Sequence, residues 1–196
     1  MTRPLVYFIR HGETPWNVEG RLQGQAENDI SENGRRQADR NGARLSRLIT
    51  DPSPFDFVAS PMRRTRETME RVRAAMGLDP NTYRTDDRLV EVSFGDWQGY
   101  TFSELEAAEP GVTKARKRNK WYFVPPGEGA ESYQILMERV RPWLEELRQP
   151  TVCVTHGGVM RTLFRMVLGT EPGDAAKLEV FQDRILRLQD NRLDWL

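Results

Sequence analysis

Short apolar runs alternate along the chain with longer segments in which apolar positions recur at helical spacing. The runs at residues 5–9, 57–59 and 152–154 are typical of short buried strands. The longer segments predict helices that begin near Ser31, Ser60, Ser132 and His156 and end near residues 49, 76, 148 and 168. Strands that alternate with amphipathic helices predict an α/β fold, a three-layer α/β/α sandwich with a mostly parallel central sheet.

Weaker signals predict the connecting elements. Ser60 and Pro61 suit the N-cap and the first turn of the second helix. Residues 179–183 and 185–188 favour two strands that close the sheet. The remaining short signals indicate a strand or extended loop at 89–92, an ordered turn at 94–99 and a short helix at 101–106.

Residues 109–130 interrupt this alternation. Prolines lie towards both ends of the segment, a basic run extends from Lys114 to Lys120, and there is no long apolar stripe. We therefore expect a lid-like excursion over an edge of the sheet, within a single domain that spans residues 1–196. A basic run of this kind is usually a solvated surface.

Charge and cysteine content exclude several classes of partner. Lys plus Arg and Asp plus Glu both total 29, so the formal net charge is zero and no broad field attracts nucleic acid or an anionic membrane. Cys153 is the only cysteine, which excludes an internal disulfide and favours a cytoplasmic location; its place in a strand predicts a buried structural residue. The first apolar run is too short for a membrane span or a signal sequence.

The only two histidines stand in matching contexts. His11 and His156 each come just after a predicted strand, and each is followed by glycine. Ligands bind outside the carboxyl ends of parallel strands, so two such imidazoles can share one pocket. A neutral imidazole can attack phosphorus, and Arg10 offers a planar fork for phosphate oxygens. A lone histidine at a strand end is more often structural, but this matched pair favours a phosphate-handling enzyme.

A metal site is the main alternative use of two histidines among many carboxylates. The positive charge of Arg10 beside His11 would repel a metal ion while attracting phosphate. The sequence also has no His-x-His or His-x-x-x-His pair. We therefore expect neither a metal nor another cofactor.

Five short motifs occur in order along the chain. Arg-His-Gly-Glu-Thr stands at 10–14 and Val-Thr-His-Gly-Gly-Val at 154–159, with three further motifs at 16–24, 60–68 and 89–99. Together they resemble the signatures of the histidine phosphatase superfamily, which includes the cofactor-dependent phosphoglycerate mutases. The resemblance implies a phosphoglycerate mutase-like fold.

The resemblance also implies a role for each matching residue. His11 would be the nucleophile that carries a phosphohistidine intermediate, and Glu91 would protonate the leaving oxygen. Arg10, Arg64 and His156 would hold the phosphoryl oxygens, where fixed positive donors stabilise the transition state. Further substrate-binding positions are Asn17, Gln23, Gly24 and Gly157, the last through its N–H at a helix start.

The family contains both hydrolases and mutases. Mutases of the phosphoglycerate type usually carry a Glu-Arg-His-Tyr-Gly-like segment and a long lysine-bearing insertion, whereas this compact chain has Glu-Val-Ser-Phe-Gly at 91–95. We therefore expect a phosphomonoesterase that hydrolyses a small phosphorylated metabolite. A phosphoglycerate mutase-type phosphotransferase and a non-catalytic phosphate-binding relative remain as alternatives. Whichever applies, the basic run at 114–120 could place a cation over a second anionic group of the substrate.

Overall fold

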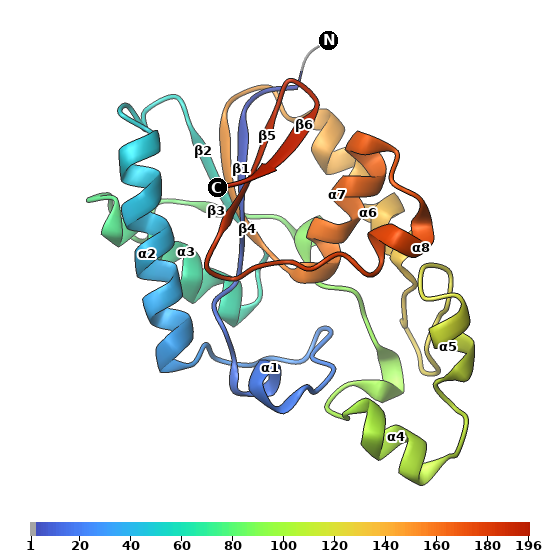
Figure 1. Cartoon of the computed structure of the whole chain (residues 1–196). Coiled ribbons are helices and arrows are strands. Elements are labelled where there is room, and N and C mark those ends of the chain that lie inside the picture. The colour runs from blue at the N-terminus through green and yellow to red at the C-terminus, as the bar shows by residue number, and fades with distance from the viewer. Residues whose placement is uncertain (1–2) are drawn as a thin grey trace.

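The computed structural model describes residues 3–196, and within them six strands form one sheet in the order β3-β2-β4-β1-β5-β6 (Figure 1). The strands are β1 (Val6–Arg10), β2 (Asp56–Ala59), β3 (Arg84–Thr85), β4 (Thr151–Thr155), β5 (Ile185–Gln189) and β6 (Arg192–Trp195). The first four in spatial order are parallel, and β5 and β6 are each antiparallel to the strand before them. The predicted mostly parallel sheet is confirmed.

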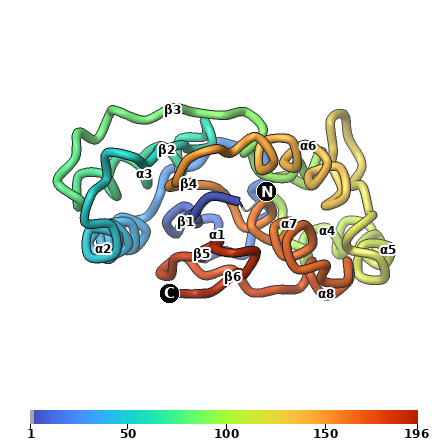
Figure 2. The backbone as a smooth tube through the Cα atoms, turned by 90° about the horizontal axis from the view of Figure 1, so that it is seen from above, coloured from blue at the N-terminus to red at the C-terminus, as the bar shows by residue number. Residues whose placement is uncertain are grey.

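Helices cover both faces of the sheet, as the predicted sandwich requires. One face carries α2 (Glu32–Leu48) and α3 (Arg63–Ala75), and the other carries α6 (Tyr133–Glu146) and α7 (Gly157–Leu168). Figure 2 shows the two helical layers on either side of the strands. Among residues 3–196, no helix combines the length and the apolar character that a membrane crossing requires.

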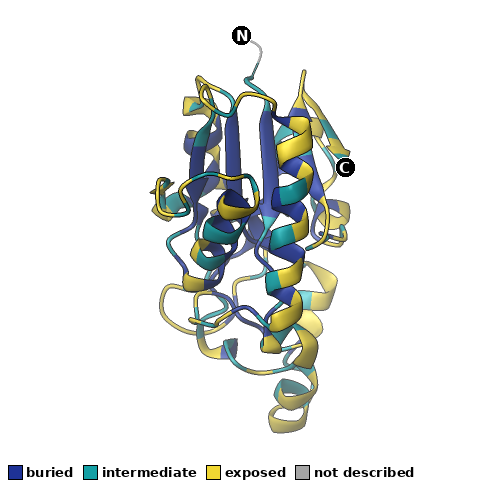
Figure 3. Cartoon of the chain, turned by 90° about the vertical axis from the view of Figure 1, so that its left-hand side faces the viewer, coloured by how far each residue is buried: buried dark blue, intermediate teal, exposed yellow. Residues whose placement is uncertain are grey.

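The alternation of side chains along β1 explains why two layers are needed. Val6 and Phe8 belong to the core that includes α6 and α7, whereas Tyr7 and Ile9 belong to the core that includes α2 and α3. β1 and β4 lie in the middle of the sheet and are almost wholly buried (Figure 3). Their continuous apolar runs are those of parallel strands that are covered on both faces.

The register of β1 and β4 brings their carboxyl ends level. Arg10 is the partner of Thr155, and the backbone N–H of His11 donates to the carbonyl of Thr155 at 2.9 Å. The next residue of each strand is a histidine. The two histidines therefore leave neighbouring strands at the same edge of the sheet.

Short elements surround this edge. α1 (Pro15–Glu19) follows β1 directly, and α4 (Phe102–Ala108) and α5 (Lys114–Arg118) extend beyond the carboxyl ends of the strands (Figure 1). The remaining short helices are α8 (Pro172–Ala175) and the 3-10 turns Asp87–Leu89 and Gly95–Trp97. The predicted excursion at 109–130 thus contains one short helix, which carries most of the basic run.

Several predicted helix ends are confirmed by hydrogen bonds. The Ser31 hydroxyl accepts from the N–H of Gly34 at the start of α2, and the Ser132 hydroxyl accepts from the N–H of Ile135 at the start of α6. At its carboxyl end, α7 stops at Gly169, which adopts φ 70°, a left-handed conformation that glycine adopts readily.

Two local predictions are wrong. α3 is capped at Met62 without a side-chain bond, because the Ser60 hydroxyl contacts a histidine instead. Residues 179–183 form no strand. The last strand of the sheet is instead β6, which is joined to β5 by a two-residue turn at Asp190 and Asn191, whose φ angles are 49° and 57°. Of the two alternatives for residues 89–92, the loop is the one found: Leu89 ends a 3-10 turn, and the residues after it pair with no strand of the described chain.

Candidate active site

The two histidines meet at the carboxyl edge of the sheet. The ring centroids of His11 and His156 are 5.3 Å apart and their planes are inclined at 59°. Both side chains are buried, with relative exposures of 3% and 0%. These two histidines, which are 145 positions apart in the sequence, therefore share one site.

The hydrogen bond of His11 identifies its reactive nitrogen. Nδ1 lies 2.8 Å from the carbonyl oxygen of Gly12, and because a carbonyl only accepts, Nδ1 carries the hydrogen. Nε2 is left with its lone pair. Burial, with the charges of Arg64 and Arg10, lowers the pKa of His11 well below its ordinary value. The ring is therefore neutral at pH 7, the state that a nucleophile requires.

The partly buried Arg10 and the fully buried Arg64 face the same cavity, which has a volume of about 140 Å³. Arg10 Nη1 donates to the carbonyl of Val180 at 2.9 Å, and Arg64 donates through Nη1 and Nη2 to the carbonyls of Ala26 and Gly24 at 2.8 and 2.7 Å. Within residues 3–196 the Nε atom of each has no partner, and no carboxylate lies within 4.0 Å of either guanidinium.

These unpaired guanidinium groups are the clearest sign of an anion site. Burial lowers the pKa of both Arg10 and Arg64 to about 10, so both remain charged at neutral pH. A buried charge is normally paired, and an unpaired one is costly. An anionic ligand that enters the cavity would supply the missing acceptors.

Glu91 lines the same cavity, and two backbone donors hold its carboxylate. The N–H of Val92 donates to Oε1 at 2.9 Å, and the N–H of Gly158 donates to Oε2 at 3.0 Å. A Cβ at position 158 would collide with this carboxylate, so glycine is required there. This glycine follows Gly157, the position whose N–H is predicted to bind substrate.

An ion pair that the sequence analysis missed holds the segment of Glu91. Arg139 and Glu131 form a two-pronged pair at 2.9 and 2.8 Å. The Arg139 guanidinium also donates to the carbonyls of residues 88, 90 and 91, while Glu131 accepts from the N–H of Ser93. Arg139 lies on α6 and Glu131 just before it, whereas the backbone groups that they contact lie 38 to 51 residues earlier in the sequence. No local pattern signals such a contact.

Ser60 is a second residue that the sequence analysis did not place in the site. Its Oγ lies 2.8 Å from Nε2 of His156, and His156 Nδ1 is buried without a partner among residues 3–196. Burial and the charge of Arg64 lower the pKa of His156 well below its ordinary value, so this ring is also neutral at pH 7. His156 is not among the residues that line the cavity, and its ring lies beside that of His11.

Asn17 reaches the cavity from the first turn of α1. Its Oδ1 accepts from the N–H of Thr14 at 3.1 Å and from Nε2 of Gln182 at 3.0 Å, and Gln182 also donates to the carbonyl of His11 at 3.1 Å. The Thr14 hydroxyl in turn accepts from the N–H of Asn17, so Thr14 caps α1. Gln182 fixes both Asn17 and the His11 backbone, and no motif signals it.

The other predicted binding positions also line the cavity. Gln23 is buried and its Oε1 has no partner within the described residues, and the neighbouring Gly24 adopts φ 50°. Gly157 lies where a Cβ would come within 3.3 Å of Arg161 Nη1 and 3.5 Å of Arg10 Nε. All the predicted site residues except His156 line this cavity. The ring of His156 lies beside that of His11, which does line it. Cys153, in contrast, is buried in β4 and has no part in the site.

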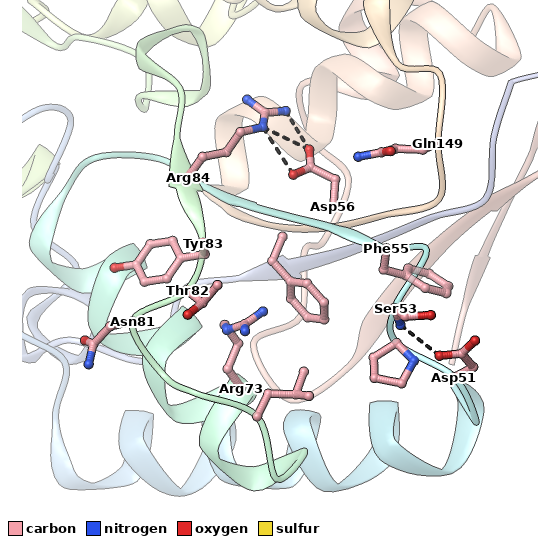
Figure 4. Close-up of a pocket in the computed structure, with 13 residues that line it drawn as sticks. Asp51, Ser53, Phe55, Asp56, Arg73, Asn81, Thr82, Tyr83, Arg84 and Gln149 are labelled. Atoms are coloured by element: carbon pink, nitrogen blue, oxygen red, sulfur yellow. Dashed lines mark hydrogen bonds and ion pairs between the residues drawn. The ribbon is translucent and has the colours of Figure 1, made fainter.

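A separate cavity of about 670 Å³ lies near the start of β2 (Figure 4). Its charged groups already have partners within the described residues, and Asp51 accepts from the N–H of Ser53. Arg84 donates to both oxygens of Asp56, and the Arg73 guanidinium lies 4.4 Å from the centroid of the Phe57 ring. Neither histidine lines this cavity, so the unpaired charge and the reactive imidazole are both at the other edge of the sheet.

Residues 6–193 match the family model of the histidine phosphatase superfamily (branch 1), and the chain belongs to that superfamily. Glucosyl-3-phosphoglycerate phosphatase from Mycobacterium tuberculosis (strain ATCC 25618 / H37Rv) is 32% identical over 174 residues, which cover 82% of this chain and 74% of the relative. The probable phosphoglycerate mutase GpmB of Salmonella choleraesuis (strain SC-B67) is 31% identical over 196 residues, with coverage of 97% and 87%.

The fold of the chain is also found in a solved relative. The native structure of mycobacterial glucosyl-3-phosphoglycerate phosphatase has a TM-score of 0.79 and 29% identity, and the match covers 100% of this chain and 97% of that one. The expected family and its fold are therefore confirmed. Within residues 3–196, no group of three or more His, Cys, Asp or Glu side chains is arranged to hold a metal ion, and cofactor independence stays a prediction.

Proposed function

We propose that this protein is a phosphatase that hydrolyses small phosphomonoesters through a phosphohistidine on His11. The observation that carries the proposal is the hydrogen bond of His11 Nδ1, which leaves Nε2 free, in a cavity lined by two guanidinium groups without a carboxylate partner among residues 3–196. A neutral nucleophile beside fixed positive charge is the arrangement that phosphoryl transfer requires. The relatives reported above include a phosphatase of known structure, which supports hydrolysis.

In the proposed first step, Nε2 of His11 attacks phosphorus and the bond to the leaving oxygen breaks. Arg10 and Arg64 neutralise the charge on the phosphoryl oxygens, and His156 donates to one of them. Glu91 delivers a proton to the leaving oxygen, so that the alcohol departs uncharged. The phosphoryl group is then bonded to His11.

In the second step, water attacks the phosphohistidine from the side that the alcohol has left. Glu91, now without its proton, takes a proton from this water. The products are inorganic phosphate and the free imidazole of His11. The carboxylate that acts as acid in the first step thus acts as base in the second and ends the cycle protonated.

Two further proposals concern the whole chain. We treat residues 1–196 as one catalytic domain, with 109–130 as a lid over the carboxyl edge of the sheet; the position of α4 and α5 beyond that edge supports the lid (Figure 1). A cytoplasmic location is supported by the single cysteine, which cannot form an internal disulfide.

The direct test is hydrolysis of p-nitrophenyl phosphate, with His11→Ala as the inactive variant. A matched control is Arg63→Ala, because Arg63 adjoins Arg64 but is 62% exposed at its side chain and pairs with Asp29. We expect wild type and the control to be active and to yield an acid-labile phosphoenzyme, which His11→Ala lacks. Activity in His11→Ala would exclude the proposed intermediate.

Mutase activity is the second candidate, because one of the similar relatives is named a probable phosphoglycerate mutase. It is tested by the conversion of 3-phosphoglycerate to 2-phosphoglycerate, with and without bisphosphoglycerate. We expect release of inorganic phosphate to exceed this conversion. Faster conversion than release would replace the phosphatase proposal with a mutase.

A further inference from the structure

The segment 178–182, between α8 and β5, holds two arginines of the candidate active site through its backbone. The carbonyl of Leu178 accepts from Nε of Arg161 at 2.9 Å, and the carbonyl of Val180 accepts from Nη1 of Arg10 at 2.9 Å. Both arginines line the active-site cavity. The segment belongs to no strand of the described chain, so its carbonyls are available to these side chains.

The pairing of β1 with β5 brings the end of this segment to the nucleophile. The two strands are antiparallel, with Ile9 opposite Ile185. Residues that follow β1 therefore lie beside residues that precede β5. Gln182 accordingly lies next to His11, and its Nε2 donates to the His11 carbonyl at 3.1 Å. The register of the sheet thus sets the place of Gln182.

The contact with His11 fixes which end of the Gln182 amide faces the site. A carbonyl oxygen only accepts, so the atom beside it must be the amide nitrogen. This nitrogen carries two hydrogens. One is donated to the His11 carbonyl, and the other is donated to Oδ1 of Asn17 at 3.0 Å. A single amide therefore joins the backbone of the nucleophile to the side chain of Asn17.

The orientation of the Asn17 amide follows from the same reasoning. Its Oδ1 lies 3.1 Å from the backbone nitrogen of Thr14, and because a backbone N–H only donates, this atom must be the oxygen. Oδ1 thus accepts from Thr14 and from Gln182, whereas Nδ2 makes no hydrogen bond to another residue in the range 3–196. Asn17 lines the cavity, so Nδ2 is the donor that it has left for a ligand there.

Gln182 is itself anchored to a helix. Asn41, a buried residue of α2, donates through Nδ2 to the carbonyl of Gln182 at 2.9 Å. A chain of hydrogen bonds therefore runs from α2 through Gln182 to α1 and to the end of β1. These bonds restrain the Asn17 amide relative to His11. Such restraint matters for catalysis, because a displacement of about 1 Å can cost about a hundredfold in rate.

We propose that Gln182 is a positioning residue for phosphoryl transfer, which holds the Asn17 amide so that Nδ2 donates to a phosphoryl oxygen beside His11. This inference rests on the proposed phosphatase function. Gln182 is not among the residues that line the cavity, so it acts through Asn17 and through the His11 backbone. Glu91 is held by separate donors. The role of Gln182 therefore concerns the phosphoryl group and not the leaving oxygen.

The first test replaces Gln182 by methionine, which is similar in length but donates no hydrogen bond. We expect Gln182→Met to lower kcat/KM about tenfold, the effect of one hydrogen bond to a charged group. The loss should be equal for p-nitrophenyl phosphate and glycerol 3-phosphate, because the leaving oxygen is not involved. Gln189→Met is the matched control with wild-type kinetics, since Gln189 is exposed at the end of β5. A loss for one substrate only would contradict the proposed role.

A double-mutant cycle separates this role from a general loss of structure. In an Asn17→Ala background there is no amide left to hold, so Gln182→Met should cost only about twofold, through the His11 backbone. An equal loss in both backgrounds would show that Gln182 does not act through Asn17. If methionine prevents folding, Gln182→Glu replaces it in the cycle. Glutamate has the same shape, but its carboxylate oxygen accepts where the amide nitrogen donates.

Binding of inorganic phosphate, measured by calorimetry, distinguishes failure of this inference from failure of the proposed function. We expect the Kd for phosphate to be about tenfold higher in Gln182→Met than in wild type, and this effect to be largely lost in the Asn17→Ala background. A wild type that binds phosphate but hydrolyses no phosphomonoester would contradict the phosphatase, and the binding cycle would still test Gln182. Equal affinity in wild type and Gln182→Met, or a wild type that binds no phosphate, would overturn the positioning role.

Discussion

The hydroxyl of Ser60 lies 2.8 Å from Nε2 of His156, although the two residues follow different strands of the sheet. Because β2 and β4 are parallel neighbours, each strand delivers its next residue to the same edge. We expect Ser60 to donate to Nε2, which places the ring hydrogen on Nδ1. Nδ1 is the atom without a partner among residues 3–196, and a phosphoryl oxygen would supply one.

We therefore predict that Ser60→Ala lowers kcat/KM for phosphomonoesters about fivefold, equivalent to the ~1 kcal/mol of one net hydrogen bond. Ser60→Thr keeps the hydroxyl and should restore most of the activity. Steady-state kinetics check this, with the exposed Ser46→Ala as the control. Identical kinetics in Ser60→Ala and wild type would show that Ser60 does not position His156.

Glu91→Gln separates proton donation from binding. Without an acid, a poor leaving group such as a simple alcohol should depart about a hundredfold more slowly, whereas p-nitrophenolate needs little protonation and should be affected less. The measurement is the ratio of kcat values for glycerol 3-phosphate and p-nitrophenyl phosphate. A ratio unchanged from wild type would place the proton donor elsewhere.

The pair of Glu131 and Arg139 should matter through Glu91. Arg139→Met removes the three hydrogen bonds that the guanidinium donates to the carbonyls of residues 88, 90 and 91, and it leaves Glu131 without its partner. We expect the same leaving-group signature as for Glu91→Gln, but weaker, and a lower thermal midpoint. The control on the same helix is Arg141→Met, since the Arg141 side chain is 44% exposed. Loss of stability alone, with unchanged kinetics, would limit the pair to a structural role.

Acid should destabilise the fold through its two histidines. In the unfolded chain each histidine binds a proton near its ordinary pKa of 6.5, but in the folded state the pKa of His11 and of His156 is well below that value. The unfolded state therefore binds more protons as the pH falls below about 6.5, and the free energy of unfolding decreases. Urea unfolding at pH 7.5, 6.5 and 5.5 tests this. The decrease should be smaller in His11→Asn; an equal decrease in that variant would assign it to other groups.

Much of the fold and of the candidate site could be predicted from local pattern. The apolar runs and helical periodicities indicated the main strands and helices because each reports which side of a local element is buried. The histidines were recognisable because each follows a strand directly, and parallel strands open towards a common edge. Motif matches then indicated Arg64 and Glu91, whose neighbours in the sequence give no physical reason to choose them.

The contacts between distant segments were decided only by the tertiary structure. Whether Ser60 caps a helix or contacts His156 depends on the register of β2 against β4, which neither segment encodes alone. Likewise, the sequence of the basic run determined that it is charged, but packing decided that Arg116 and Lys120 lie against the rings of Phe94 and Tyr133 while their neighbours are exposed. Local pattern determines the character of an element, whereas packing decides which surfaces of different elements meet.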